Sequence, residues 1–309
     1  MRSVSGASGR FRIQYMEHQA ESFSHHGYGE GRLVRGLRLT GQSWTFVRER
    51  PRLLVLPGLA AVASVLSMVA IQLPILYFFS DDNIGLAMGL CGAVAALPLT
   101  FITVFFNVGF LKMVEADLRG ESPTVGYGLR AARARGRQIL GWAILSAAVG
   151  ALFRALEQLP VVGGWAGQAL SLIGGLAWSL ATFFIVPVLA LEGLGPVASM
   201  RRSASVFRSS WGETVTGDVA IGFIAAFLFV PGVFGFVFAA FAFHDHSYAV
   251  GLSVGAAGIA LAAIAAAVTS ALVSLFQYFV YRDLMGVAPA GPFTKQDLAS
   301  AVKPKKRFR

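Results

Sequence analysis

Long stretches of this 309-residue chain contain no charged side chain. Runs without Asp, Glu, Lys or Arg cover residues 53–80, 83–111, 158–191, 219–243 and 246–281. About 20 apolar residues in a helix cross the roughly 30 Å hydrocarbon core of a bilayer. Only 14% of all residues are charged, whereas the average for globular proteins is roughly 25%. The pattern argues against a soluble fold and indicates a polytopic membrane protein.

A further span is shorter and less obvious. Residues 138–153 are uncharged before Arg154 and Glu157, which are spaced i, i+3 and can pair on one helix face in the headgroup region. The run at 158–191 has room for a short turn and then another helix. We therefore predict an all-α fold with six transmembrane helices in three hairpins, at about residues 53–79, 84–111, 139–157, 165–191, 217–243 and 250–281.

The positions of lysine and arginine predict the orientation of these spans. All Lys and Arg residues except Arg154 lie in the two terminal segments or in the connections after the second and fourth spans. Cytoplasmic segments carry the excess of Lys and Arg. We therefore expect a cell-membrane protein with both termini in the cytoplasm. It would have a disordered tail at 1–36, a six-helix membrane domain at 37–286 and a basic tail at 287–309.

The connection between the fourth and fifth spans includes PVASMRRSASVFRSSW, residues 196–211. On a helix with 100° per residue, its larger apolar side chains and one alanine share a face: Val197, Met200, Ala204, Phe207 and Trp211. Arg202 lies on the far side, and Arg201 and Arg208 lie at the flank. The pattern predicts an amphipathic helix on the cytoplasmic membrane surface, with its arginines facing anionic lipid headgroups.

Similar features recur along the chain. The same spacing of mostly apolar or small residues precedes the first and third spans, and Arg130, Arg133 and Arg137 share one flank that we also expect to face lipid. Spans two, four and six each end with an aromatic cluster, then a carboxylate (Glu115, Glu192 or Asp283), then a glycine. We predict three divergent repeats of surface helix, span, short outer turn and span. The alternative is that basic segments beside spans simply look alike.

Two segments carry a resemblance to a known family: PTVGYGLRAARARGRQILGWAILSA and ATFFIVPVLALEGLGPVASMRRSASVFRSSWGE. Their order resembles a bacterial family of six-pass integral membrane proteins that is a domain of unknown function, over roughly residues 36–286. The resemblance implies the six-helix fold. It implies no established activity, so it assigns no functional residues.

Asn107 in the second span and Glu192 at the end of the fourth are candidates for an intramembrane polar cleft, beside an expected kink at Pro187. Ionisable groups at this depth are costly and often mark function. The alternative for Glu192 is an ion pair with Arg201 or Arg202 at the membrane boundary. The alternative for Asn107 is a hydrogen bond between helices.

We expect no metal, cofactor or catalytic site. His244, Asp245 and His246 are the residues most like metal ligands, but adjacent positions in a short loop rarely converge on one ion. The sequence has no Walker motif, no H-E-x-x-H and no G-x-S-x-G. The net charge of +10 and the C-terminal KPKKRFR favour anionic membrane lipids over nucleic acid as partners, since each basic residue at the surface adds about 1 kcal/mol of attraction.

Two classes of function remain. The favoured class is a non-enzymatic protein that organises or scaffolds the inner leaflet through its surface helices. The alternative is a small permease or lipid transporter with a cleft near Glu192 and Asn107. Because the spans carry few polar groups that could conduct ions or sugars, its cargo would be lipid-like.

Overall fold

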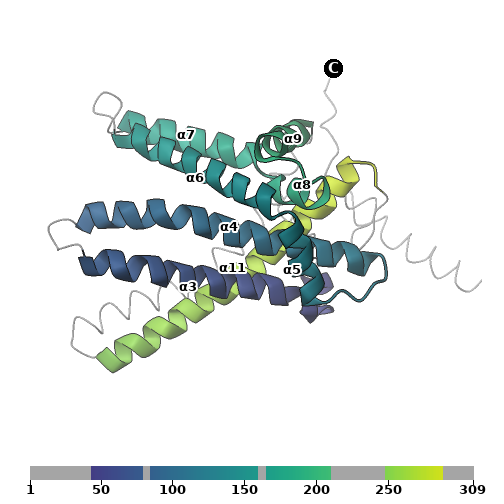
Figure 1. Cartoon of the computed structure of the whole chain (residues 1–309), viewed down its shortest axis with the longest axis horizontal. Coiled ribbons are helices and arrows are strands. Elements are labelled where there is room, and N and C mark those ends of the chain that lie inside the picture. Colours follow the sequence, from purple (N-terminus) through teal and green to yellow (C-terminus); the bar gives the residue numbers. More distant parts are fainter. Residues whose placement is uncertain (1–42, 79–83, 159–164, 210–247, 288–309) are drawn as a thin grey trace, which may run out of the picture.

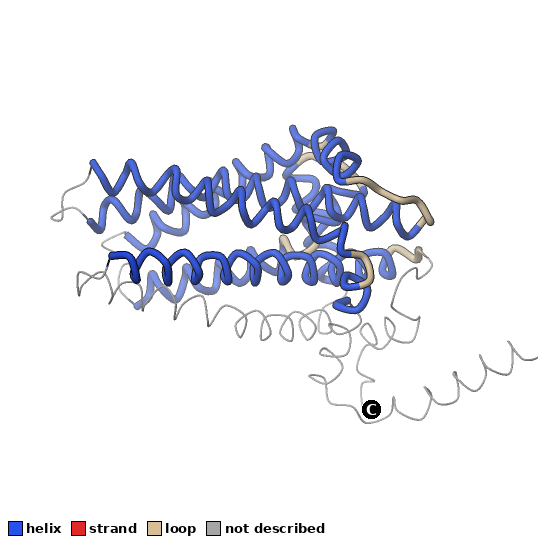
Figure 2. The backbone as a smooth tube through the Cα atoms, turned by 90° about the horizontal axis from the view of Figure 1, so that it is seen from below, coloured by secondary structure: helices blue, strands red, loops and turns tan. Residues whose placement is uncertain are grey.

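The structure is a computed structural model that describes residues 43–78, 84–158, 165–209 and 248–287. Within these ranges it contains helices and short connections and no β-strand, as Figure 2 shows. The fifth predicted span, the histidine-containing loop after it, the predicted tail at 1–36 and residues 288–309 lie outside the described residues.

A helical turn at 43–48 precedes the first span. The elements that follow are η1 (Pro51–Leu54), α3 (Val55–Phe78), α4 (Ile84–Leu118), α5 (Val125–Ala134), α6 (Gly136–Gln158), α7 (Trp165–Ala181), α8 (Ile185–Leu191), α9 (Pro196–Ser209) and α11 (Tyr248–Leu284). Helix α4 packs against α3, α5, α6, α8 and α11, and α6 packs against α7. Figure 1 shows the long helices running along the bundle, with α5, α8 and α9 gathered at one end. We call this end the basic end.

Five of the predicted spans are confirmed as helical segments long and apolar enough to cross a membrane: Pro51–Gln72, Val94–Leu118, Gly136–Leu156, Gly167–Leu191 and Ala249–Leu284. Helix α4 continues past the predicted end of the second span at 111, as far as Leu118. Lys112 and Glu115 pair across one helical turn at 2.8 Å. Such i, i+3 pairs stabilise a helix beyond its apolar part.

The fourth predicted span is interrupted near Pro187. Helix α7 ends at Ala181 and α8 begins at Ile185, after a turn at 182–184. Proline has no N–H to donate, and its ring clashes with the carbonyl four residues earlier. That carbonyl belongs to Phe183, which explains why the break precedes the proline rather than coinciding with it.

The packed core lies towards the basic end. Buried side chains such as Val108, Leu111, Val188, Leu275 and Phe279 form one cluster there. Away from this cluster, large apolar side chains on α3, α6, α7 and α11 are exposed, and Leu172 has an exposed fraction of 66%. Soluble monomers rarely expose large apolar patches. These exposed surfaces are those expected to face lipid, which supports a multi-pass membrane protein.

Candidate functional site

Three helices end close together at the basic end: α4 at Leu118, α8 at Leu191 and α11 at Leu284. Each is followed within two residues by a glycine with positive φ: Gly120 (81°), Gly193 (64°) and Gly286 (71°). Glycine takes this left-handed conformation without a steric cost and closes helices in this way. The carboxylate-then-glycine pattern seen in the sequence therefore marks three matching helix ends.

A cavity of about 410 Å³ lies between these three ends. Its walls combine apolar residues with charged and phenolic ones: Leu118, Leu191, Met285, Val287, Glu115, Arg119, Glu192, Tyr278, Tyr281 and Arg282. Ligand sites in proteins commonly have volumes of about 300–1,000 Å³ and a few convergent polar groups. The cavity is therefore the candidate functional site.

Glu192 joins three elements on one side of the cavity. Its Oε1 atom accepts a hydrogen bond from Arg202 Nε of α9 at 2.9 Å and another from the Tyr281 hydroxyl of α11. The hydrogen bond that Arg202 donates to Glu192 is the main cause of the raised pKa of Arg202, and a hydrogen bond between Arg202 and Tyr281 raises it further. Arg202 also approaches Met285 Sδ at 3.0 Å. The ion pair that the sequence allowed between Glu192 and Arg202 is thus present.

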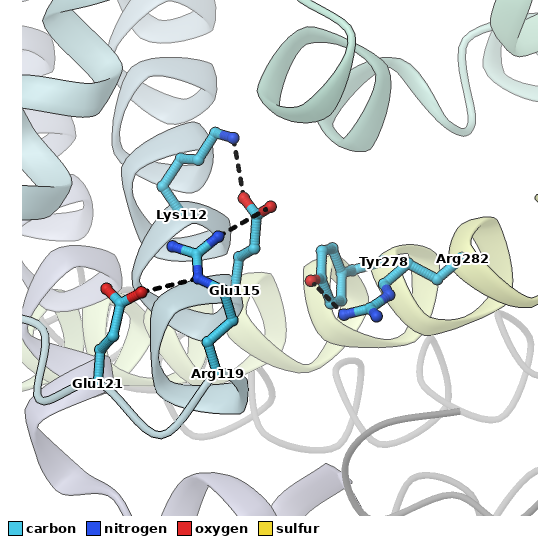
Figure 3. A network of polar contacts seen from close by, with 6 residues as sticks. All are labelled: Lys112, Glu115, Arg119, Glu121, Tyr278 and Arg282. Atoms are coloured by element: carbon cyan, nitrogen blue, oxygen red, sulfur yellow. Dashed lines mark hydrogen bonds and ion pairs between the residues drawn. The ribbon is translucent and has the colours of Figure 1, made fainter. Parts of the chain in front are cut away.

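Figure 3 shows a second network at the end of α4, of which Glu115 and Arg119 line the cavity. Glu115 lies between Lys112, at 2.8 Å, and Arg119, at 3.5 Å. Arg119 also pairs with Glu121 at 2.8 Å, and this hydrogen bond is the main cause of the raised pKa of Arg119. These contacts hold the carboxylate of Glu115 and the guanidinium of Arg119 beside the cavity.

Tyr278 and Arg282 form the α11 side of the cavity (Figure 3). Arg282 Nη1 donates to the Tyr278 hydroxyl at 3.0 Å, and its guanidinium lies 5.6 Å from the centre of that ring. Among the described residues, no carboxylate lies within ion-pair distance of Arg282.

Asn107 is not part of this site. It is buried between α4 and α11, where its Nδ2 donates to Ser270 Oγ at 2.9 Å and its Oδ1 accepts from the same hydroxyl at 3.0 Å. The structure therefore does not bring Asn107 and Glu192 together. Asn107 makes the contact between helices that the sequence analysis gave as its alternative role.

Five of the six arginines predicted to face lipid are exposed: Arg130, Arg133, Arg137, Arg201 and Arg208. We call these five the surface arginines. None of them lies within ion-pair distance of a carboxylate in the described part of the chain. The sixth, Arg202, is instead turned toward Glu192.

Helix α9 docks on the bundle through a face that overlaps the predicted apolar face only in part. Its buried residues include Ser199, Ser203 and Phe207, whereas Val197 on the predicted apolar face is 49% exposed. Ser203 Oγ accepts a hydrogen bond from the backbone N–H of Phe184 at 2.9 Å, in the break between α7 and α8. Ser199 Oγ donates to the carbonyl oxygen of Leu194 at 3.0 Å. These hydroxyl groups pair with the backbone and can therefore be buried.

The roles of Tyr278, Tyr281 and Arg282 were not predicted from the sequence. The tyrosines had the pattern of interfacial aromatics, and the carboxylate-then-glycine signal of each even-numbered span could have located the three helix ends. Nothing in the sequence shows that Tyr281 meets Glu192, which is 89 residues away.

A family model described as "Family of unknown function (DUF6159)" matches residues 93–291, which is more than half of the chain. The match covers every residue that lines the cavity. It begins later than the resemblance expected from about residue 36, so α3 lies before the matched region. No curated protein and no solved structure matches the chain.

Proposed function

We propose that this chain, which belongs to the DUF6159 family of unknown function, is a non-enzymatic protein that organises the inner leaflet of the cell membrane. In this proposal it crosses the membrane six times in three hairpins, with both termini in the cytoplasm. The surface arginines bind anionic phospholipids and hold the basic end against the leaflet. The observation that supports this role most directly is their exposure without a described carboxylate partner.

The charge distribution supports this orientation. Every Lys and Arg in the described part of the chain, except Arg154, belongs to the segments around the basic end. Because cytoplasmic segments carry the excess of Lys and Arg, we place this end in the cytoplasm. Anionic lipids of the cytoplasmic leaflet attract such clusters.

The geometry of α9 supports direct contact with lipid. Val197, Arg201, Ala204 and Arg208 are spaced i, i+4, i+7 and i+11, so they lie on one side of the helix. This side faces away from Ser199, Ser203 and Val206, the buried residues on the other side of the helix. Apolar and basic side chains together on an exposed helix face are typical of helices that lie in the membrane interface.

The experiment replaces all five surface arginines with glutamine in the purified protein. Bound phosphatidylglycerol and phosphatidylcholine are then measured by native mass spectrometry at low and high salt. At about 1 kcal/mol per arginine, we expect the affinity for phosphatidylglycerol to fall more than about 100-fold and its salt dependence to weaken. Arg154→Gln, which lies away from the surface arginines, is the control and should change neither the affinity for phosphatidylglycerol nor its salt dependence. An unaltered preference for phosphatidylglycerol in the five-arginine variant would refute the proposal.

A lipid transporter is the second candidate function, because the cavity beside Glu192 has both apolar and charged walls. The location of Asn107 outside this cavity weighs against the particular cleft first considered. A lipid-scrambling assay in proteoliposomes separates the two functions. If the protein is a scaffold, the rate of lipid scrambling should equal that of protein-free vesicles. If it is a transporter, scrambling should be faster than in those vesicles, and Glu192→Gln should slow it.

A further inference from the structure

The cavity lies at the depth where the apolar spans give way to charged residues. Helix α4 carries Lys112 and Glu115 in its last two turns, and α11 carries Tyr278, Tyr281 and Arg282 near its end. Tyrosines are enriched at the level of lipid headgroups. A ligand in this cavity would therefore lie at the level of the lipid headgroups, and a lipid could enter the cavity from the bilayer.

The walls of the cavity differ from one another. Leu118, Leu191, Met285 and Val287 supply apolar surface, while Glu192 and Arg282 supply opposite charges. A ligand that matches all of these walls has an apolar part and carries both a cation and an anion. This combination excludes simple ions and favours an amphiphile with a zwitterionic headgroup.

Glu192 and Arg282 line the same cavity but do not pair with each other, since no ion pair within 4 Å joins them. Glu192 uses Oε1 for both of its hydrogen bonds, so Oε2 accepts none from a described residue. Arg282 uses Nη1 for Tyr278, so Nε and Nη2 donate to no described residue. Each side chain therefore keeps hydrogen-bonding capacity for a ligand placed between them.

We propose that this cavity binds an aminoalkyl phosphate, the group found in the headgroup of phosphatidylethanolamine. The primary ammonium donates to Glu192 Oε2, and the phosphate accepts hydrogen bonds from Arg282. Hydrogen bonds between charged partners are stronger than neutral ones. A quaternary ammonium, as in phosphatidylcholine, has no N–H to donate, and phosphatidylglycerol has no cation. The site therefore discriminates among the three headgroups.

The test measures lipid retention by native mass spectrometry in the wild-type protein and in the five-arginine variant described above. The variant removes the surface binding of phosphatidylglycerol, so this site is measured independently of the proposed scaffold role. We expect both proteins to retain phosphatidylethanolamine at least tenfold more strongly than phosphatidylcholine, and the variant to retain it tenfold more strongly than phosphatidylglycerol. Adding Arg282→Gln or Glu192→Gln should reduce this retention at least tenfold, whereas Arg154→Gln should leave it within twofold.

A steric variant covers the case in which loss of the Glu192 ion pair unfolds the protein. Val287 is 44% exposed and lines the cavity, so Val287→Trp should fill the cavity without lowering the melting temperature, and should abolish the headgroup preference.

Titration with soluble phosphoethanolamine distinguishes a lipid ligand from a free aminoalkyl phosphate: weak binding assigns the site to the lipid, and binding as tight as that of the lipid assigns it to the free compound. Equal retention of the three lipids, or retention unchanged in Arg282→Gln and Val287→Trp, would overturn the proposal.

Discussion

The contact between Ser203 and the backbone of Phe184 gives a sharp test of how α9 is held. Both residues are fully buried, and the hydroxyl accepts the Phe184 N–H at 2.9 Å. This N–H lies in the break before Pro187. Ser203→Ala removes the acceptor and leaves a donor that water does not reach. A buried donor without a partner costs about 1–3 kcal/mol, so we expect the variant to lose about this much stability.

The assay is reversible unfolding of the purified protein in detergent, followed by circular dichroism. Ser205→Ala is the matched control, since the Ser205 hydroxyl donates to the carbonyl of Arg202 on the exposed side of the same helix. Surface substitutions of this kind usually change stability by less than about 0.5 kcal/mol. Equal stabilities of the two variants would show that the Ser203 contact does not hold α9 on the bundle.

Two further predictions concern the same end of the molecule. Arg202→Gln should destabilise the protein by about 1 kcal/mol more than Arg201→Gln, because only Arg202 pairs with Glu192, although each substitution removes one charge. The effect is small because the pair is partly exposed: the side chain of Arg202 is 39% exposed and that of Glu192 is 28% exposed. Equal melting temperatures of these variants would contradict it. Gly193→Ala should lower stability by about 1 kcal/mol or more, because its φ of +64° is a left-handed conformation that residues with a Cβ rarely adopt. Gly195→Ala has open space and should have a much smaller effect on chemical unfolding; comparable losses would refute the argument.

Four of the five described spans could be predicted because their runs without charge are long and physically unambiguous, whereas the third was predicted from only 16 uncharged residues before Arg154. The ends of the spans could not be predicted, because charged residues at a helix end also pair within the helix. Glu115 pairs with both Lys112 and Arg119, at spacings of three and four residues. Helix α4 therefore continues for seven residues past Leu111, the end of the uncharged run.

The site was only partly predictable. The ion pair between Glu192 and Arg202 was one of the two roles considered for Glu192, because the two residues are only ten positions apart in the sequence. The docking of α9 through serines was not predictable from its own pattern. It depends on a backbone N–H that becomes available only where α7 and α8 separate, and on a close approach between segments 19 residues apart.

The central claim is that the basic end faces the cytoplasm while the apolar helices cross the membrane. Single-cysteine labelling of intact cells with a membrane-impermeant maleimide tests it directly, in a background in which Cys91 is replaced by alanine. The account predicts that Val162→Cys is labelled in intact cells and that Ser205→Cys, on the exposed side of α9, is labelled only after permeabilisation. Labelling of residue 205 in intact cells, or protection of residue 162, would contradict it.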